Sequence, residues 1–227
     1  MTTTTTHRAS AQWVPFALVA LSLGPAIAGS LRVTGLMGGP QLMPADPRID
    51  AVPLPVIVHI VSVIPYSLLG AFQFSSRLRA RRPAWHRATG RLLVPLAMAV
   101  AFSGLWMTVA YPSKPGSGEL LYTFRLAVGT AMAASVVLGF AAIRRGDVMR
   151  HRAWMIRAYA LALGAGTQVL TGAVGPTMVG TSVLANDLTM GAAWAINLAV
   201  AEYVIRSPKS RASRNSSRVA AAEGARR

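Results

Sequence analysis

The chain has no cysteine, and only seven of its 227 residues are aspartate or glutamate. The missing cysteines exclude disulfides, thiolate nucleophiles, iron–sulfur ligation and cysteine-based zinc sites. Charged residues make up 13% of the chain, whereas a soluble domain usually has about 25%. The sequence also lacks a nucleophile beside a base, a carboxylate pair and a phosphate-binding loop. The chemistry of soluble enzymes is therefore not expected, and oxidoreductase-like electron transfer in a membrane is the one enzyme-related activity left open.

Long apolar segments take the place of those features. Hydrophobic residues form 53% of the chain, and they gather in runs of about 20 residues, the length that crosses roughly 30 Å of hydrocarbon. Because every backbone amide in lipid needs an internal partner, each run is expected to be a helix. The predicted spans cover residues 13–36, 54–76, 91–111, 119–143, 153–174 and 186–206. They predict an all-α integral membrane bundle of six transmembrane helices over 13–206, between disordered segments at 1–12 and 207–227.

The basic residues are distributed unevenly along the chain. Lysine and arginine number 23, which gives a net charge of +16. Such an excess is typical of nucleic-acid-binding proteins. Here, however, the arginines stand at the ends of apolar segments, where membrane orientation and anionic lipid head groups explain them. We therefore expect the lipid bilayer and its anionic head groups as partners, and no nucleic acid.

The same distribution predicts how the chain is threaded. The connectors after the second and fourth spans read RLRARRPAWHRATGR (77–91) and IRRGDVMRHRAWMIR (143–157), and a basic tail follows the sixth span. In the other connectors the basic residues are Arg48 and Lys114. The positive-inside rule then places the basic connectors and both termini on the cytoplasmic side of a bacterial inner membrane.

The first span has a second interpretation. Its sequence WVPFALVALSLGPAIAGS (13–30) has an apolar core and ends near an A-x-A-like AIA, a pattern typical of a cleaved signal peptide. The basic region before it is thin, and the apolar pattern continues past Ser30. We expect the segment to be retained as a helix, with cleavage as the alternative.

Polar residues inside the outer halves of the spans are the first candidates for a site. Counting 1.5 Å per residue, His59 and Arg125 each lie roughly 8–10 Å below the outer boundary, and Gln168 should lie at a similar level. A charge at the centre of a spanning helix costs about 2.5–3.5 kcal/mol. His59 also begins a stripe on one helical face that continues through Ser62, Tyr66, Gly70 and Gln73.

This pattern favours a polar cavity around His59 and Arg125, in a small-solute or proton-coupled transporter or a membrane sensor. The histidine is suited to proton coupling because it titrates near neutral pH. The simpler alternatives are a buried hydrogen bond for His59 and an Arg125 side chain that snorkels to the outer interface.

A second group of candidates lies on the cytoplasmic side. His86 and His151 open the third and fifth spans at matching depth, near Arg91 and Arg157. Membrane b-type cytochromes hold haem between two histidines, and basic side chains meet its propionates. A haem b electron-transfer protein is therefore the first functional hypothesis, with His86 and His151 as metal ligands. The candidate cofactor-binding residues are His59, His86, His151, Arg125, Arg91 and Arg157.

Structural explanations exist for the same residues. His86 and His151 can be residues of basic loops at the level of the lipid head groups, and Arg157 can form an ion pair with Glu202. Trp154 and Tyr159 are expected as interfacial aromatic residues. A third hypothesis is accordingly a structural or assembly subunit, in which polar side chains only hold helices together.

Three motifs resemble a known family. They are FQF (72–74) after the histidine at position 59, HRATGR (86–91) and HRAWMIRAYA (151–160). Together they resemble the bacterial membrane-protein family called domain of unknown function 2306, over approximately residues 55–206. The resemblance implies a multi-span inner-membrane protein and no established activity. The chain departs from the family at Ala71, where a proline is usual, and at Gln168 and Val169, where a basic residue is expected.

Overall fold

The computed structural model describes residues 12–207, and its regular structure in that range is entirely helical. The segments predicted to be disordered, 1–12 and 207–227, lie outside the described residues except for residues 12 and 207. Five long helices have the length and apolar composition to cross a membrane: α2 (Val14–Leu36), α4 (Leu54–Gln73), α6 (Pro83–Ala110), α7 (Glu119–Arg144) and α10 (Val183–Arg206). The shorter helices are α3 (Pro47–Ala51), α5 (Ser76–Arg81), α8 (Val148–Ala162) and α9 (Gly164–Val179). The all-α prediction is confirmed.

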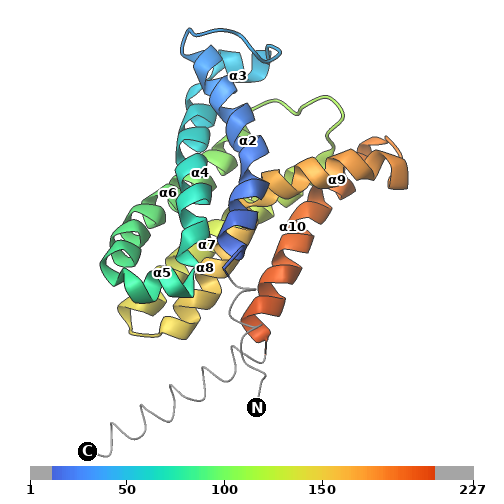
Figure 1. Cartoon of the computed structure of the whole chain (residues 1–227). Helices are drawn as coiled ribbons and strands as arrows, with labels where there is room; N and C mark the ends of the chain where they lie inside the picture. The colour runs from blue at the N-terminus through green and yellow to red at the C-terminus, as the bar shows by residue number, and fades with distance from the viewer. Residues whose placement is uncertain (1–11, 208–227) are drawn as a thin grey trace, which may run out of the picture.

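The fifth predicted span differs from a single straight helix. The structure divides it into α8 and α9, which meet at Leu163, so that five candidate spans are found in place of six. In Figure 1, α9 runs across the direction of its neighbours. Side chains satisfy polar groups at the break: the Asn197 side-chain amide donates to the Ala160 backbone carbonyl at 3.1 Å, and the Thr167 hydroxyl donates to Asn197 Oδ1 at 2.8 Å. Irregular backbone at membrane depth requires protein contacts of this kind.

The two ends of the bundle carry different connectors (Figure 1). At one end, α2 begins, α5 joins α4 to α6, α7 turns into α8, and α10 ends. We call this the basic end, because it holds the arginine-rich segments 77–91 and 143–157 together with Arg206. At the opposite end lie α3 and the connector 111–118 between α6 and α7, which we call the cavity end.

The core lies where α4, α6, α7 and α8 pack together, and it is built from small residues around two tyrosines. Ala71 and Ala158 are fully buried, and Tyr66 and Tyr159 are also buried. Gly70 leaves room for the Tyr159 ring, since a side chain at this position would collide with it. The Tyr159 hydroxyl donates to the Ser67 carbonyl at 2.7 Å. Tyr159 was expected at the membrane interface, and it is instead a core residue of the bundle.

The outer surface of the long helices is strongly apolar. Large hydrophobic side chains are exposed on it, among them Phe102, Val137, Val200 and Tyr203. Soluble monomers rarely expose so extended an apolar surface, whereas lipid tails cover it well. The chain is therefore a multi-pass membrane protein.

Candidate functional site

A cavity of about 470 Å³ lies inside the bundle at the cavity end. Its walls come from α2, α4, α6, α7, α8, α9 and α10, and residues of α3 and of the connector 111–118 complete its outer side. Its volume falls in the range of small-molecule sites. The walls are largely apolar and include Ile60, Val63, Met107, Met132, Leu161 and Trp194. A few polar groups therefore decide what this cavity can hold.

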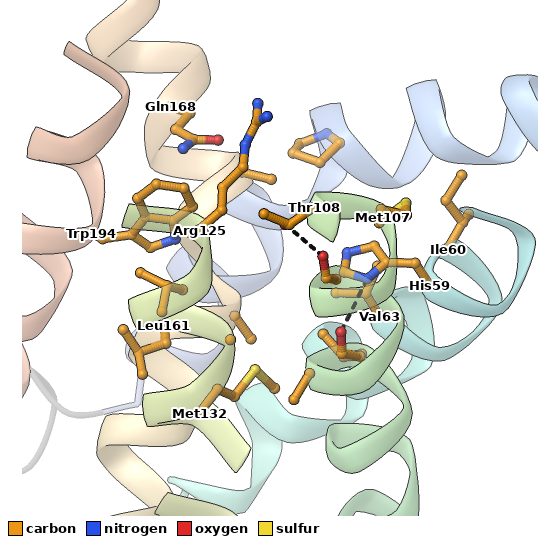
Figure 2. Close-up of a pocket in the computed structure, with 18 of the residues that line it drawn as sticks. His59, Ile60, Val63, Met107, Thr108, Arg125, Met132, Leu161, Gln168 and Trp194 are labelled. Atoms are coloured by element: carbon orange, nitrogen blue, oxygen red, sulfur yellow. Dashed lines mark hydrogen bonds between the residues drawn. The ribbon is translucent and has the colours of Figure 1, made fainter. Parts of the chain in front are cut away.

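His59 lies on one side of the cavity, where hydrogen bonds fix its imidazole ring (Figure 2). Its Nδ1 lies 3.0 Å from the Ser103 hydroxyl and 3.2 Å from the Val100 carbonyl oxygen. The Ser103 hydroxyl donates its own hydrogen to the Ala99 carbonyl at 2.5 Å, so that both neighbours of Nδ1 act as acceptors. Nδ1 of the neutral ring must then carry the proton, which makes Nε2 the acceptor nitrogen. Within residues 12–207 no hydrogen bond engages Nε2.

Arg125 comes from the second turn of α7 and lies on the other side of the cavity, with Gln168 and Trp194 (Figure 2). It is half-buried, and in the described part of the chain its guanidinium forms no ion pair and no hydrogen bond. The Gln168 amide donates to the Met190 carbonyl at 3.2 Å. The Asp187 carboxylate acts on Arg125 electrostatically without forming an ion pair with it. A cation held at this depth without a direct ion pair is costly. The cavity thus contains a positive charge that an anion would neutralise.

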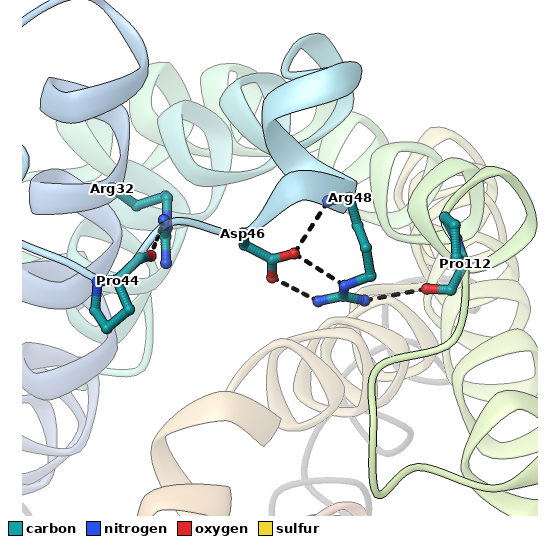
Figure 3. A network of polar contacts seen from close by, with 5 residues as sticks. All are labelled: Arg32, Pro44, Asp46, Arg48 and Pro112. Carbon is teal, nitrogen blue, oxygen red and sulfur yellow. Dashed lines mark hydrogen bonds and ion pairs between the residues drawn. The ribbon is translucent and has the colours of Figure 1, made fainter.

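A second arginine in the cavity wall is already neutralised. Arg48 of α3 forms an ion pair with Asp46, in which Nη2 lies 2.6 Å from Oδ2 and Nε lies 3.0 Å from Oδ1 (Figure 3). The remaining Nη1 donates to the Pro112 carbonyl at 3.2 Å. The hydrogen bonds from Arg48 hold the pKa of the Asp46 carboxyl below its usual value. This ion pair was not predicted from the sequence. The signal for it is an aspartate two positions before an arginine in the same connector.

Asp187 is a further residue that sequence analysis missed. It lies in the second turn of α10 and is buried. Its carboxylate accepts hydrogen bonds from the backbone amides of Gly118, at 3.0 and 3.1 Å, and Leu121, at 3.1 Å. Gly118 is the N-cap of α7 and has no side chain to do this itself. A carboxylate at a helix N-terminus also meets the positive end of the helix dipole, so Asp187 is a capping residue.

The haem hypothesis names three histidines, of which two are neighbours: His86 and His151 lie close enough to interact electrostatically, and His59 lies apart from them. His86 lies in the first turn of α6 and His151 in the first turn of α8, both at the basic end, whereas His59 lies in the cavity. His151 Nδ1 is 2.9 Å from the Gly139 carbonyl oxygen. Neither His86 nor His151 lines the cavity. Residues 12–207 contain no group of three or more histidine, cysteine, aspartate or glutamate side chains that could hold a metal ion.

The other arginine candidates have structural surroundings. Arg157 Nε lies 2.5 Å from Glu202 Oε1, and its guanidinium carbon lies 4.8 Å from the centre of the Trp154 ring. Arg206 pairs with the second oxygen of Glu202 at 3.0 Å. The predicted pair between Arg157 and Glu202 is thus confirmed. Arg91 is exposed on α6.

Comparison with known families gives one result. The model of a family described as "predicted membrane protein (DUF2306)" matches residues 56–205. No curated protein and no solved structure matches the chain. The matched range runs from near the start of α4 to near the end of α10. It includes His59 and Arg125 of the cavity, whereas the cavity residues of α2 and α3 lie before it. The chain belongs to this DUF2306 family of predicted membrane proteins.

Proposed function

We propose that this protein is a small-solute transporter that holds an anionic solute in the cavity. Arg125 supplies the positive charge, and His59 supplies an acceptor nitrogen that can take up a proton. The observation that carries the proposal is the unpaired Arg125 guanidinium inside a cavity of ligand size. Structural arginines in this protein have partners, as Arg48 and Arg157 do, and Arg125 does not within residues 12–207.

The interrupted fifth pass favours transport over sensing. Leu161, Leu163 and Gly166 flank the junction of α8 with α9, and all three line the cavity. Many secondary transporters build their substrate site from such discontinuous helices, and one bundle of helices rocks against another around the fixed site. A bent pass made of α8 and α9 also returns the chain to the cavity end, which supports six passes and termini on one side.

The proposed location is the inner membrane of a bacterium, with the basic end in the cytoplasm and anionic head groups around it. Because the chain has no cysteine, single cysteines report their side of the membrane without background. Lys114→Cys at the cavity end should react with a membrane-impermeant maleimide added to intact cells, and Arg145→Cys at the basic end should react only after lysis. The reverse labelling pattern would overturn the orientation.

The binding test uses the purified full chain and a panel of small anions: hexanoate, adipate and inorganic phosphate. We expect at least one of them to raise the melting temperature in detergent, since a ligand stabilises the state that binds it, and hexanol to have no effect. Arg125→Gln should lose the shift. Arg145→Gln, an exposed arginine at the basic end, should keep it as the matched control.

Transport is tested with the same anions in proteoliposomes. Wild-type protein should take up the bound anion faster when the outside is acidified, because a proton on His59 Nε2 can accompany the anion. If the protein binds an anion but does not take it up, it is a sensor and not a transporter. An Arg125→Gln variant that binds the anion as well as wild type would refute the proposed site. The haem hypothesis stays a prediction, and a Soret band at about 410–430 nm in the purified protein would support it.

A further inference from the structure

We infer that the cavity selects monocarboxylates with an apolar tail, and that Asp46 sets this charge selectivity by occupying Arg48. The inference rests on the proposed function, because it names the class of anion that the same cavity holds. It makes Asp46 a specificity-determining residue that does not itself line the cavity.

The first argument is a count of charges. Arg48 and Arg125 are the charged side chains that line the cavity. Asp46 neutralises the charge of Arg48 through two hydrogen bonds of 2.6 and 3.0 Å. Arg125 forms no ion pair with any residue of 12–207. Asp187 lies nearby, but its carboxylate is directed to the amides that begin α7, where the helix dipole offsets it. With His59 neutral, one positive charge is left for a ligand to balance.

The second argument is the nature of the walls. In Figure 2, Val63, Met132 and Leu161 lie below the level of Arg125 in that view, and Ile60 and Met107 lie beside His59. A ligand whose carboxylate meets Arg125 therefore places the rest of its atoms against apolar side chains. A second carboxylate buried there would lose its hydration without gaining a partner, which is costly. An aliphatic or aromatic tail is instead stabilised there, because its apolar surface is removed from water.

The third argument is the position of the Arg48–Asp46 pair. Arg48 belongs to α3 at the outer side of the cavity, and its Nη1 is held by the Pro112 carbonyl at 3.2 Å. Without the Asp46 carboxylate, the same guanidinium would have two nitrogens free at the cavity wall. The site would then present two unpaired cations, which suits a dicarboxylate.

The test compares two acids of equal chain length, hexanoate and adipate, by isothermal titration of the detergent-purified full chain at neutral pH. Wild-type protein should bind hexanoate at least about tenfold more tightly than adipate, as expected for an unpaired buried charge. Asp46→Asn should bring the two affinities within about threefold of each other by improving adipate. Asp50→Asn, an exposed acidic residue of the same short helix, should keep the wild-type ratio.

A charge-matched variant tests whether any effect of Asp46→Asn comes from the change in charge or from a disturbed α3. The double variant Asp46→Asn/Arg48→Gln removes both members of the pair, leaves one net positive charge and should restore the preference for hexanoate. If the single variant keeps the wild-type ratio, or the double variant fails to restore it, the inference is wrong while the anion site stands. If neither acid nor phosphate binds wild-type protein, the proposed function itself fails.

Discussion

The two ends of the bundle treat their charged groups in opposite ways. At the basic end, Arg157 and Arg206 share the carboxylate of Glu202, and Arg157 also lies over Trp154. At the cavity end, Arg125 lines a cavity of about 470 Å³ and forms no ion pair with any residue of 12–207. An ion pair offsets part of the cost of placing charges in a membrane protein, whereas a charge without a partner bears that cost in full. Under the proposed function, this difference separates residues that hold the fold from residues that form a site.

Packing follows the same division. On the side of the cavity that faces the basic end, the Tyr159 ring packs against two other rings. Its centroid lies 5.9 Å from that of Tyr66 and 4.9 Å from that of Phe74. Small neighbours such as Gly70 and Ala158 let these rings approach the backbone. The cavity end has no comparable aromatic cluster in its interior among residues 12–207. Substitutions at the two ends should therefore affect stability and binding separately.

The largest effect on stability is expected for Tyr159→Ala. It removes a buried aromatic ring and the hydrogen bond to the Ser67 carbonyl, and a change of this kind typically costs about 3–5 kcal/mol of unfolding free energy. The measurement is reversible unfolding in mixed micelles. Tyr203→Ala is the control, because this tyrosine is 76% exposed on the lipid-facing surface. Equal losses in the two variants would show that Tyr159 does not belong to the core.

Arg157→Met should have a smaller effect. The side chains of Arg157 and Glu202 are 26% and 29% exposed, so the loss should be about 1–2 kcal/mol, between the values of exposed and fully buried pairs. Anion binding at the cavity end should not change. A variant as stable as wild type would mean that the ion pair contributes nothing to the fold.

Arg125→Met gives the sharpest contrast between the ends. It removes a cation that has no partner to lose, so the unfolding free energy should stay within about 0.5 kcal/mol of wild type or rise. The same variant should lose the melting-temperature shift with anions. If Arg125→Met destabilises the protein as much as Arg157→Met does, Arg125 is a structural residue and the contrast between the two ends disappears.

The smallest expected effect is a pH dependence at the cavity end. Arg48 lowers the pKa of Asp46 in the folded protein, so the pair stabilises the fold at pH values above the unfolded pKa of about 3.9. That stability is lost as the pH falls through the lower, folded pKa. The melting temperature of wild-type protein should therefore fall as the pH is lowered from about 6 to about 3. The melting temperature of Asp46→Asn should fall less over the same range. If the melting temperatures of the two proteins change equally with pH, the ion pair between Asp46 and Arg48 does not contribute to stability.

Much of the site followed from depth along the helices. Counting residues from the ends of apolar segments placed His59, Arg125 and Gln168 at one level, and all three line the cavity. The same reasoning matched Arg157 with Glu202. Depth works as a guide because a membrane fixes the direction of each span, so that residues at equal height on neighbouring helices are within reach.

What depth could not predict are contacts that depend on rotation and on distant side chains. The break at Leu163 is stabilised by a hydrogen bond from Asn197, 34 positions later in the chain. The hydropathy of the sequence around Leu163 indicates only one continuous apolar segment. Tyr159 looked interfacial because its level is near the basic end, and only the glycine at position 70 shows that its ring turns inward. The pairing of Asp46 with Arg48 occurs in a connector, where periodicity gives no guidance.

The cap on α7 has a mechanical consequence. Asp187 ties the second turn of α10 to the first residues of α7 through three hydrogen bonds. A displacement of α10 must either carry α7 with it or break these bonds together. Because Arg125 lies about 9 Å along α7 from Glu119, a tilt of α10 would be transmitted to the Arg125 side chain in the cavity wall.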